Sequence, residues 1–196
     1  MTAVAEAGNG TGTRRTASGL ERRGLVATGV VLAIILFYAV LLPVVDAAVP
    51  LPGTHVEAGT VVNLAGRARF TPASGWKKGS GSNARQGVYI VSNGGVEFRV
   101  AAIDSSDSAR SLLTQFQDGL RKSNPGAVFS SATTFTTSRG LTGVWSGFTT
   151  LNGEGFETAF AGNGTGVVAV AIGPSGSVRE LAASVDAMFD SIGIVQ

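Results

Sequence analysis

Few residues in this sequence have the side chains that catalysis or metal binding needs. Cysteine is absent from the 196 residues, and His55 is the sole histidine. These counts exclude thiolate chemistry and sites built from several histidines, and they make a Ser-His-Asp triad difficult to assemble. Two pairs of carboxylates remain: Glu154 with Glu157, and Asp186 with Asp190. The first pair flanks a predicted turn and strand and the second shares the polar side of a predicted helix, so both are expected to be solvent-exposed. We therefore expect no catalytic residues, no cofactor and no metal.

Four residues are candidates for an interaction site or a groove: Trp76, Lys77, Lys78 and Trp145. The first three precede a loop rich in glycine and serine. For Trp76, packing in the core is the favoured alternative to a ligand platform. Trp145 is flanked by glycines on its own face of a predicted strand, where it can cover bare backbone or form the wall of a groove; covering is the favoured interpretation.

Charge is unevenly distributed along the chain. Before residue 25 there are four arginines and two glutamates, so this part carries 4 − 2 = +2. From Asp46 onward, 11 basic and 11 acidic residues sum to zero. The C-terminal part therefore lacks the basic surface that nucleic-acid binding requires, and we expect no nucleic-acid partner.

An uncharged apolar segment covers residues 25–45, a length that suits one transmembrane helix. Arg22 and Arg23 precede it and Asp46 is the first charge beyond it, which predicts a cytoplasmic N-terminus and an extracytoplasmic C-terminal part. Cleavage as a signal peptide, after Ala47, is the alternative. We expect a disordered cytoplasmic tail at 1–24, a stalk at 46–59, and one domain at 60–196.

Short stretches with alternating apolar and polar residues dominate the predicted domain. Residues 87–92 and 96–100 indicate a hairpin with its turn at Asn93-Gly94-Gly95. Further strands are expected at residues 127–137, 141–151, 155–161 and 166–172. Together they predict an antiparallel meander.

Two segments have helical spacing. Between residues 107 and 122, four apolar side chains fall on one side: Leu112, Leu113, Phe116 and Leu120. Ser177 and Glu180 predict a capping box at the start of a second helix that runs to Ile192. The order of strands, helix, meander and helix indicates an α+β fold, with a largely antiparallel sheet flanked by helices.

Several of these elements, taken together, resemble a known protein family. The segment FTPASGW at residues 70–76, the following hairpin and helix, and the ending MFDSI at 188–192 resemble the PsbP-like α/β/α sandwich over about residues 60–195. That fold occurs in extrinsic photosystem subunits, a yeast nuclear-import factor that binds a small GTPase, and actinobacterial envelope proteins such as the LpqN-type lipoproteins. Since the sequence has no cysteine to lipidate, the predicted transmembrane helix would replace the lipid anchor.

The missing catalytic residues and the resemblance together imply a non-enzymatic cell-membrane protein. Its extracytoplasmic domain is expected to act as an accessory or interaction module for another membrane or periplasmic protein of the cell envelope. The alternative is that a cleft of the same domain binds or carries an envelope lipid or other amphiphile.

Overall fold

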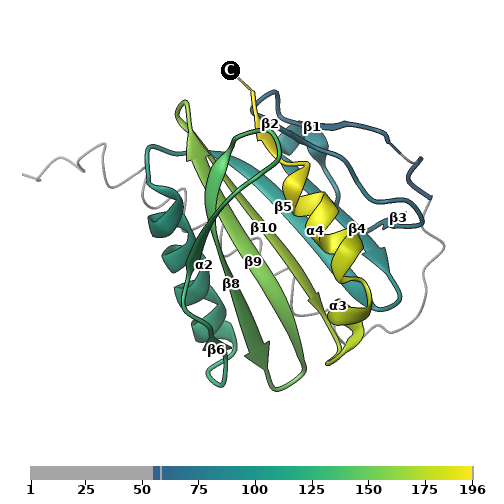
Figure 1. Ribbon diagram of the computed structural model, residues 1–196, viewed down its shortest axis with the longest axis vertical. Helices are drawn as coiled ribbons and strands as arrows, with labels where there is room; N and C mark the ends of the chain where they lie inside the picture. The colour runs from purple at the N-terminus through teal and green to yellow at the C-terminus, as the bar shows by residue number, and fades with distance from the viewer. Residues whose placement is uncertain (1–54, 58, 196) are drawn as a thin grey trace, which may run out of the picture.

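The computed structural model describes residues 55–57 and 59–195 (Figure 1). The predicted cytoplasmic tail, the transmembrane segment and most of the stalk lie outside the described residues. Within the described ranges, no helix has both the length and the apolar character needed to cross a membrane. Val56 packs against the core and donates its backbone N–H to the carbonyl of Trp76, so the domain includes residues that the sequence assigns to the stalk.

A large antiparallel sheet forms the centre of the molecule (Figure 1). Its strands are β3 (Lys77–Lys78), β4 (Val88–Asn93), β5 (Val96–Asp104), β6 (Val128–Phe129), β7 (Thr133–Thr136), β8 (Thr142–Thr150), β9 (Gly153–Gly162) and β10 (Thr165–Gly173). The strand order is β3-β4-β5-β10-β9-β8-β6, and β7 also pairs with β8. The predicted hairpin is β4–β5 and the predicted meander is β8–β9–β10, so the predicted α+β class with an antiparallel sheet is confirmed.

A second, smaller sheet was not predicted. It has the order β1-β2-β11, with β1 (Val62–Leu64), β2 (Ala68–Phe70) and β11 (Gly193–Ile194). Strands of two or three residues are too short to produce a recognisable alternation in a sequence. A short 3₁₀ helix, η1 (Ala84–Gln86), precedes β4.

Helix α2 (Ala109–Ser123) matches the helix predicted from residue 107 to 122. Ser108 caps its start, since the serine side chain accepts a hydrogen bond from the N–H of Ser111. The buried side of the helix consists of the four predicted apolar residues: Leu112, Leu113, Phe116 and Leu120. These side chains cover one face of the sheet, which we call the α2 face.

The C-terminal helix differs from the prediction in two ways. It is divided into α3 (Ser177–Glu180) and α4 (Ala182–Asp190), because Leu181 leaves helical geometry at φ −101° and ψ 11°. The predicted capping box is also wrong, since Gly176 is the N-cap and no side chain of the cap residue bonds to the helix. Instead, the carboxylate of Glu154 in β9 accepts a 3.0 Å hydrogen bond from the N–H of Gly176.

Each face of the sheet has its own hydrophobic core, which gives an α/β/α sandwich. On the α2 face, α2 packs against side chains of β8, β9 and β10. On the opposite face, called the α4 face, α3, α4 and the small sheet enclose the inward side chains of β4, β5 and β10. The predicted apolar stripe of the last helix contributes to this core through Val178, Val185, Met188, Phe189 and Ile192.

The edge strand beside β8 is interrupted. The sequence predicts one strand at 127–137, whereas the structure has β6 and β7 separated by a bulge. Phe129 pairs with Phe148, and Thr133 pairs with Trp145. The two edge residues are four positions apart in the sequence, whereas their partners in β8 are three positions apart. One extra residue is therefore inserted, which bends the edge strand and increases its twist.

Candidate interaction surface

Part of the α4 face is not covered by the C-terminal helices. Two large apolar side chains remain accessible there, Val128 at 69% exposure and Trp145 at 38%. The exposed region lies over β6, β8 and β9, beside α3 (Figure 1). We call it the β8 surface and define it by Val128, Trp145, Gly147, Thr149, Phe156 and Arg179.

Trp145 and Phe156 form the aromatic part of the β8 surface. The alternation predicted for β8 is confirmed, because Val144, Ser146 and Phe148 are buried on the α2 face. Trp145 projects from the other face, and its ring centroid lies 5.9 Å from that of Phe156 on the neighbouring strand. The tryptophan thus packs against a side chain of β9 and still leaves more than a third of its surface accessible.

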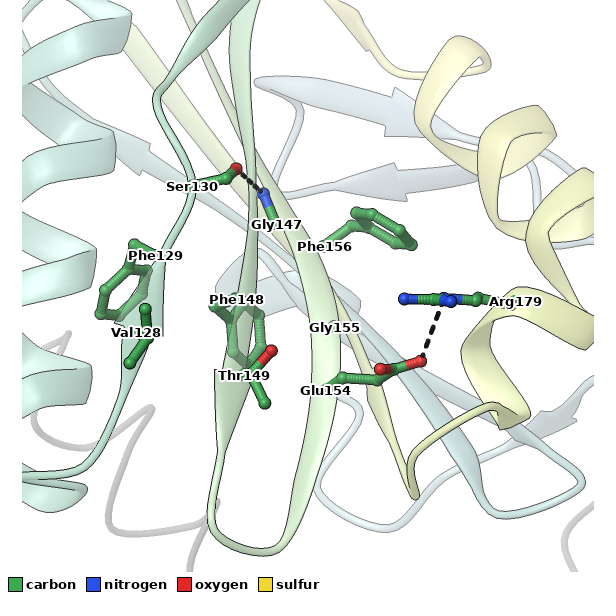
Figure 2. Close-up of a pocket in the computed structure, with 10 residues that line it drawn as sticks. All are labelled: Val128, Phe129, Ser130, Gly147, Phe148, Thr149, Glu154, Gly155, Phe156 and Arg179. Carbon is green, nitrogen blue, oxygen red and sulfur yellow. Dashed lines mark hydrogen bonds and ion pairs between the residues drawn. The ribbon is translucent and has the colours of Figure 1, made fainter.

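A shallow hollow of about 360 Å³ lies next to this aromatic pair. Figure 2 shows that β6 forms one side of the hollow, β8 and β9 form the floor, and Arg179 of α3 closes the far side. The lining residues are Val128, Phe129, Ser130, Gly147, Phe148, Thr149, Glu154, Gly155, Phe156 and Arg179. Phe129 and Phe148 belong to the core of the α2 face, so Val128 and Phe156 supply the apolar side chains on the α4 face, beside one charged wall.

That charged wall is an ion pair between Glu154 and Arg179. Arg179 Nε lies 3.6 Å from Glu154 Oε1 (Figure 2), and the arginine side chain is 79% exposed. A pair this exposed contributes little to folding stability. The guanidinium therefore keeps most of its hydrogen-bonding capacity for a bound group.

Gly147 and Ser130 shape the floor of the hollow. Gly147 donates its N–H to Ser130 Oγ at 2.9 Å, and Ser146 Oγ donates to the carbonyl of Ser130 at 2.9 Å. These bonds hold the bulge of the edge strand against β8. A Cβ on Gly147 would lie 3.5 Å from the ring of Phe156, so the glycine leaves that ring accessible to the hollow.

The other sequence-predicted candidates lie elsewhere. Trp76 is fully buried in the core of the α4 face, so it cannot line a surface groove. Lys77 and Lys78 form β3, the edge strand at the opposite end of the sheet from β6. Lys78 Nζ lies 5.7 Å from the ring centroid of Tyr89. The structure therefore does not bring these three residues together with Trp145.

Glu157 is a buried carboxylic acid, although the sequence indicates solvent exposure. It has no accessible surface, and Gln117 of α2 donates a 2.6 Å hydrogen bond to its Oε1. Burial raises the pKa of Glu157 from 4.5 to about 8, against the lowering effects of the Gln117 hydrogen bond and the charge of Arg121. The group is thus protonated at neutral pH, and its place between α2 and the sheet separates it from the β8 surface.

The remaining ionisable residues are dispersed. In the described part of the chain, no three residues of the types His, Asp or Glu are grouped so that they could hold a metal ion. His55 is exposed and forms a β-bridge with Lys77. Asp190 binds the turn after β7, with its two oxygens accepting from the backbone N–H and the hydroxyl of Ser138.

Comparison with known proteins identifies the fold. No family model matches the sequence, and no curated protein matches it. The chain is similar to the solution structure of cyanobacterial PsbP (CyanoP) from Synechocystis sp. PCC 6803, with a TM-score of 0.52 and 10% identity. That match covers 75% of this chain and 98% of the other.

A crystal structure from Bacteroides thetaiotaomicron VPI-5482 also matches, at 12% identity and a TM-score of 0.39, over 74% of this chain and 50% of the other. This TM-score is too low to bear on the fold. The match to CyanoP spans nearly all of that protein, at a TM-score above 0.5. The C-terminal part of this chain therefore has a PsbP-like fold.

Proposed function

We propose that the chain is a non-catalytic accessory protein whose PsbP-like domain docks onto a protein partner through the β8 surface. The observation that carries the proposal is an exposed tryptophan, Trp145, packed against Phe156 beside an open hollow. Tryptophan is enriched among the residues that dominate binding energy at protein interfaces. Arg179 at the rim adds a guanidinium, which can fix the orientation of a partner's carboxylate or carbonyl groups.

The rigid setting of the β8 surface favours recognition. Trp145 and Phe156 lie on adjacent, fully paired strands, so little conformational entropy is lost when a partner covers them. The bulge held by Ser130 fixes the shape of the adjoining edge. A surface of this kind can bind a partner without the ordering of a loop.

The cellular setting belongs to the same proposal. The apolar segment at residues 25–45 and the preceding arginines support a single-pass membrane protein with an extracytoplasmic domain. The resemblance to actinobacterial envelope proteins supports a cell-envelope partner. A tethered domain meets membrane partners at high effective concentration, so a modest interface would be occupied.

Site-specific photo-crosslinking in cells tests the docking surface. A photoreactive amino acid is placed in the full chain at Val128, within the β8 surface, or at Val61, an apolar residue that is 55% exposed on another part of the domain. We expect one reproducible adduct from position 128 and none from position 61. Adding Trp145→Ala should reduce the adduct about tenfold or more, since large interface aromatics often contribute over 1.4 kcal/mol.

Two results would contradict the proposal. If no reproducible adduct is recovered from position 128, the proposal of a protein partner is contradicted. If positions 128 and 61 give equal adducts, the contact is not specific to the β8 surface. A fusion of a topology reporter to the C-terminus tests the membrane arrangement separately. Activity of the reporter only in the cytosol would overturn the extracytoplasmic assignment without affecting the docking surface.

Amphiphile binding is the second candidate function. The space between the sheet and the helices is filled on both faces, with side chains such as Phe98, Met188 and Leu112 almost fully buried. An amphiphile would therefore bind in a surface hollow instead of between sheet and helix. Native mass spectrometry of the full chain, released from detergent, would detect a retained lipid, and its absence would count against this candidate.

A further inference from the structure

The described arginines fall into two groups. Four of them pair with a carboxylate: Arg67 with Asp104, Arg99 with Glu97, Arg121 with Asp118, and Arg179 with Glu154. The other four, Arg69, Arg85, Arg110 and Arg139, have no ion pair within the part of the chain that the structure describes. A guanidinium without a carboxylate keeps its full charge and all five N–H donors for another group.

Two of the unpaired arginines line one hollow. Arg69 of β2 and Arg139 of the β7–β8 turn belong to a depression of about 430 Å³. Leu141, Ile194 and Val195 contribute its apolar lining, and Gly140 and Gly193 complete it. No carboxylate lines this hollow among the residues described. It therefore combines two positive charges with an apolar wall.

Arg139 is held in place by a short, well-bonded turn. Thr137 donates its N–H to the carbonyl of Leu141 at 2.9 Å, and Gly140 has the positive φ of +80° that such a turn requires. The preceding residue, Ser138, donates its N–H at 2.6 Å and its hydroxyl at 2.5 Å to the carboxylate of Asp190. The turn is thus fixed to the C-terminal end of α4.

Asp190 is the acidic group that bears most directly on Arg139. The two hydrogen bonds from Ser138 are the main reason that the pKa of Asp190 is lowered, and the charge of Arg139 contributes less. Asp190 and Arg139 form no ion pair, so Asp190 offsets the positive charge at a distance and leaves the guanidinium donors available.

Arg69 is fixed from the other side of the hollow. It lies in the central strand of the small sheet, paired with Asn63 on one side and Gly193 on the other. A Cβ on Gly193 would lie 3.5 Å from Arg69 Nε, so the arginine side chain extends across the glycine. Because Gly193 has no side chain, the side chain of Arg69 can lie directly against β11.

We propose that the hollow between Arg69 and Arg139 binds an organic anion, with a phosphate or carboxylate group on the two guanidinium groups and a short apolar portion on Leu141, Ile194 and Val195. Planar guanidinium groups bind such oxyanions through paired hydrogen bonds. Val195 is 39% exposed, so the apolar wall is accessible from solvent. This inference deepens the amphiphile candidate and is independent of the β8 surface.

Arginine modification measures binding at individual residues. The full chain is placed in lipid nanodiscs of phosphatidylcholine, and the rate of phenylglyoxal modification of each arginine is followed by mass spectrometry. At saturating butyl phosphate, we expect about tenfold slower modification of Arg69 and Arg139. Arg85 and Arg110, the other unpaired arginines, should react at unchanged rates. Equal protection of all four, or of none, would overturn the proposal.

Two smaller probes separate the parts of the ligand. Butanol, which has the alkyl chain without the charge, should give no protection. Inorganic phosphate, which has the charge without the chain, should protect the same two arginines at a concentration about tenfold higher, because a few buried methylene groups contribute on the order of 1 to 2 kcal/mol. Equal potency of inorganic and butyl phosphate would overturn the assignment of an organic ligand.

The source of the anion is distinguished by changing the bilayer. Nanodiscs of phosphatidylglycerol carry phosphate headgroups with negative charge at the membrane surface. Protection of Arg69 and Arg139 in these discs without a soluble probe would identify a lipid headgroup as the ligand. Protection by butyl phosphate alone would identify a soluble anion, and both results support the site.

Substitutions provide an independent test of the proposed anion site. Arg69→Gln and Arg139→Gln should each weaken butyl phosphate binding about tenfold, the effect of losing charge-assisted hydrogen bonds. Arg85→Gln removes the same charge from another unpaired arginine and should leave the affinity within about twofold of the unmodified protein. Equal weakening by all three substitutions would mean attraction by net charge alone and would contradict a defined site.

Discussion

Phe98 and Arg99 are neighbours in β5, yet they point to opposite faces of the sheet and into different environments. Phe98 is buried among aromatic rings on the α4 face, with centroids 5.9 Å from Phe70 and 5.1 Å from Phe189. Arg99 is 1% exposed on the α2 face, where it pairs with Glu97. The two faces therefore obtain their stability differently, one mainly from apolar packing and the other from packing around a buried arginine and its carboxylate partner.

The polar groups of the α2 face are aligned across the sheet. Arg99 lies opposite Val170 of β10, which in turn lies opposite Glu157 of β9. Burial lowers the pKa of Arg99 to about 10 and raises that of Glu157 to about 8. Both shifts show that the α2 face disfavours charge, so its stability depends on keeping these groups paired or neutral.

The largest expected effect is on the α4 face. Phe98→Ala removes a fully buried ring and leaves a cavity between Phe70 and Phe189, so it should lower the free energy of unfolding by about 4 kcal/mol. Urea denaturation of the full chain in a non-ionic detergent, followed by circular dichroism, measures the change. A loss below about 1 kcal/mol would contradict a tightly packed aromatic core on this face.

A smaller effect is expected from the adjacent residue on the α2 face. Arg99→Met keeps much of the side-chain volume but leaves the half-buried carboxylate of Glu97 without its arginine, at a cost of about 3 kcal/mol. Adding Glu97→Gln should restore part of this stability, because the uncompensated charge is then removed. The same denaturation experiment measures both variants. If the double variant is no more stable than Arg99→Met, the charge pair is not the source of the effect.

A third expected effect depends on pH. In the unfolded chain, the carboxyl group of Glu157 ionises near 4.5, whereas in the folded protein it stays protonated up to about pH 8. The free energy of unfolding should therefore fall as the pH rises from 4.5 to 8 and then level off. Glu157→Gln removes this titration and should make the protein more stable than the unmodified chain above pH 8.

Denaturation series at several pH values check the Glu157 prediction. Glu180→Gln makes the same chemical change at an exposed position of α3 and serves as the control, so it should keep the pH dependence of the unmodified protein. An unchanged slope in Glu157→Gln would show that this carboxyl group is already ionised in the folded state at neutral pH.

The sequence predicts the features that depend on periodicity. The hairpin β4–β5, helix α2 and the meander all follow from runs of at least five residues in which apolar side chains recur at a regular interval. The outward direction of Trp145 also follows, because alternation places it opposite Val144 and Ser146. Its packing against Phe156 depends on the register between β8 and β9, which alternation alone does not determine.

The failures of prediction arise where tertiary contacts override local pattern. Glu157 points to the face of β9 that α2 covers, and only the register with α2 places Gln117 above its carboxyl group. The cap of α3 comes from Glu154, a residue more than twenty positions earlier in the chain, and not from a local serine. The hollow beside Arg69 and Arg139 joins one turn and two short strands, none of which has a recognisable sequence motif.

The extra residue in the edge strand has a consequence for self-association. Between Ser123 and Thr137 the chain has no charged side chain, so a straight edge there would be a template on which a second copy could add its own strand. The bulge limits the regular ladder at β6 to two residues before it is interrupted. At the opposite edge, Lys77 and Lys78 of β3 place positive charges that disfavour the addition of another strand. A bulge at one edge and charge at the other therefore both oppose fibril-like polymerisation.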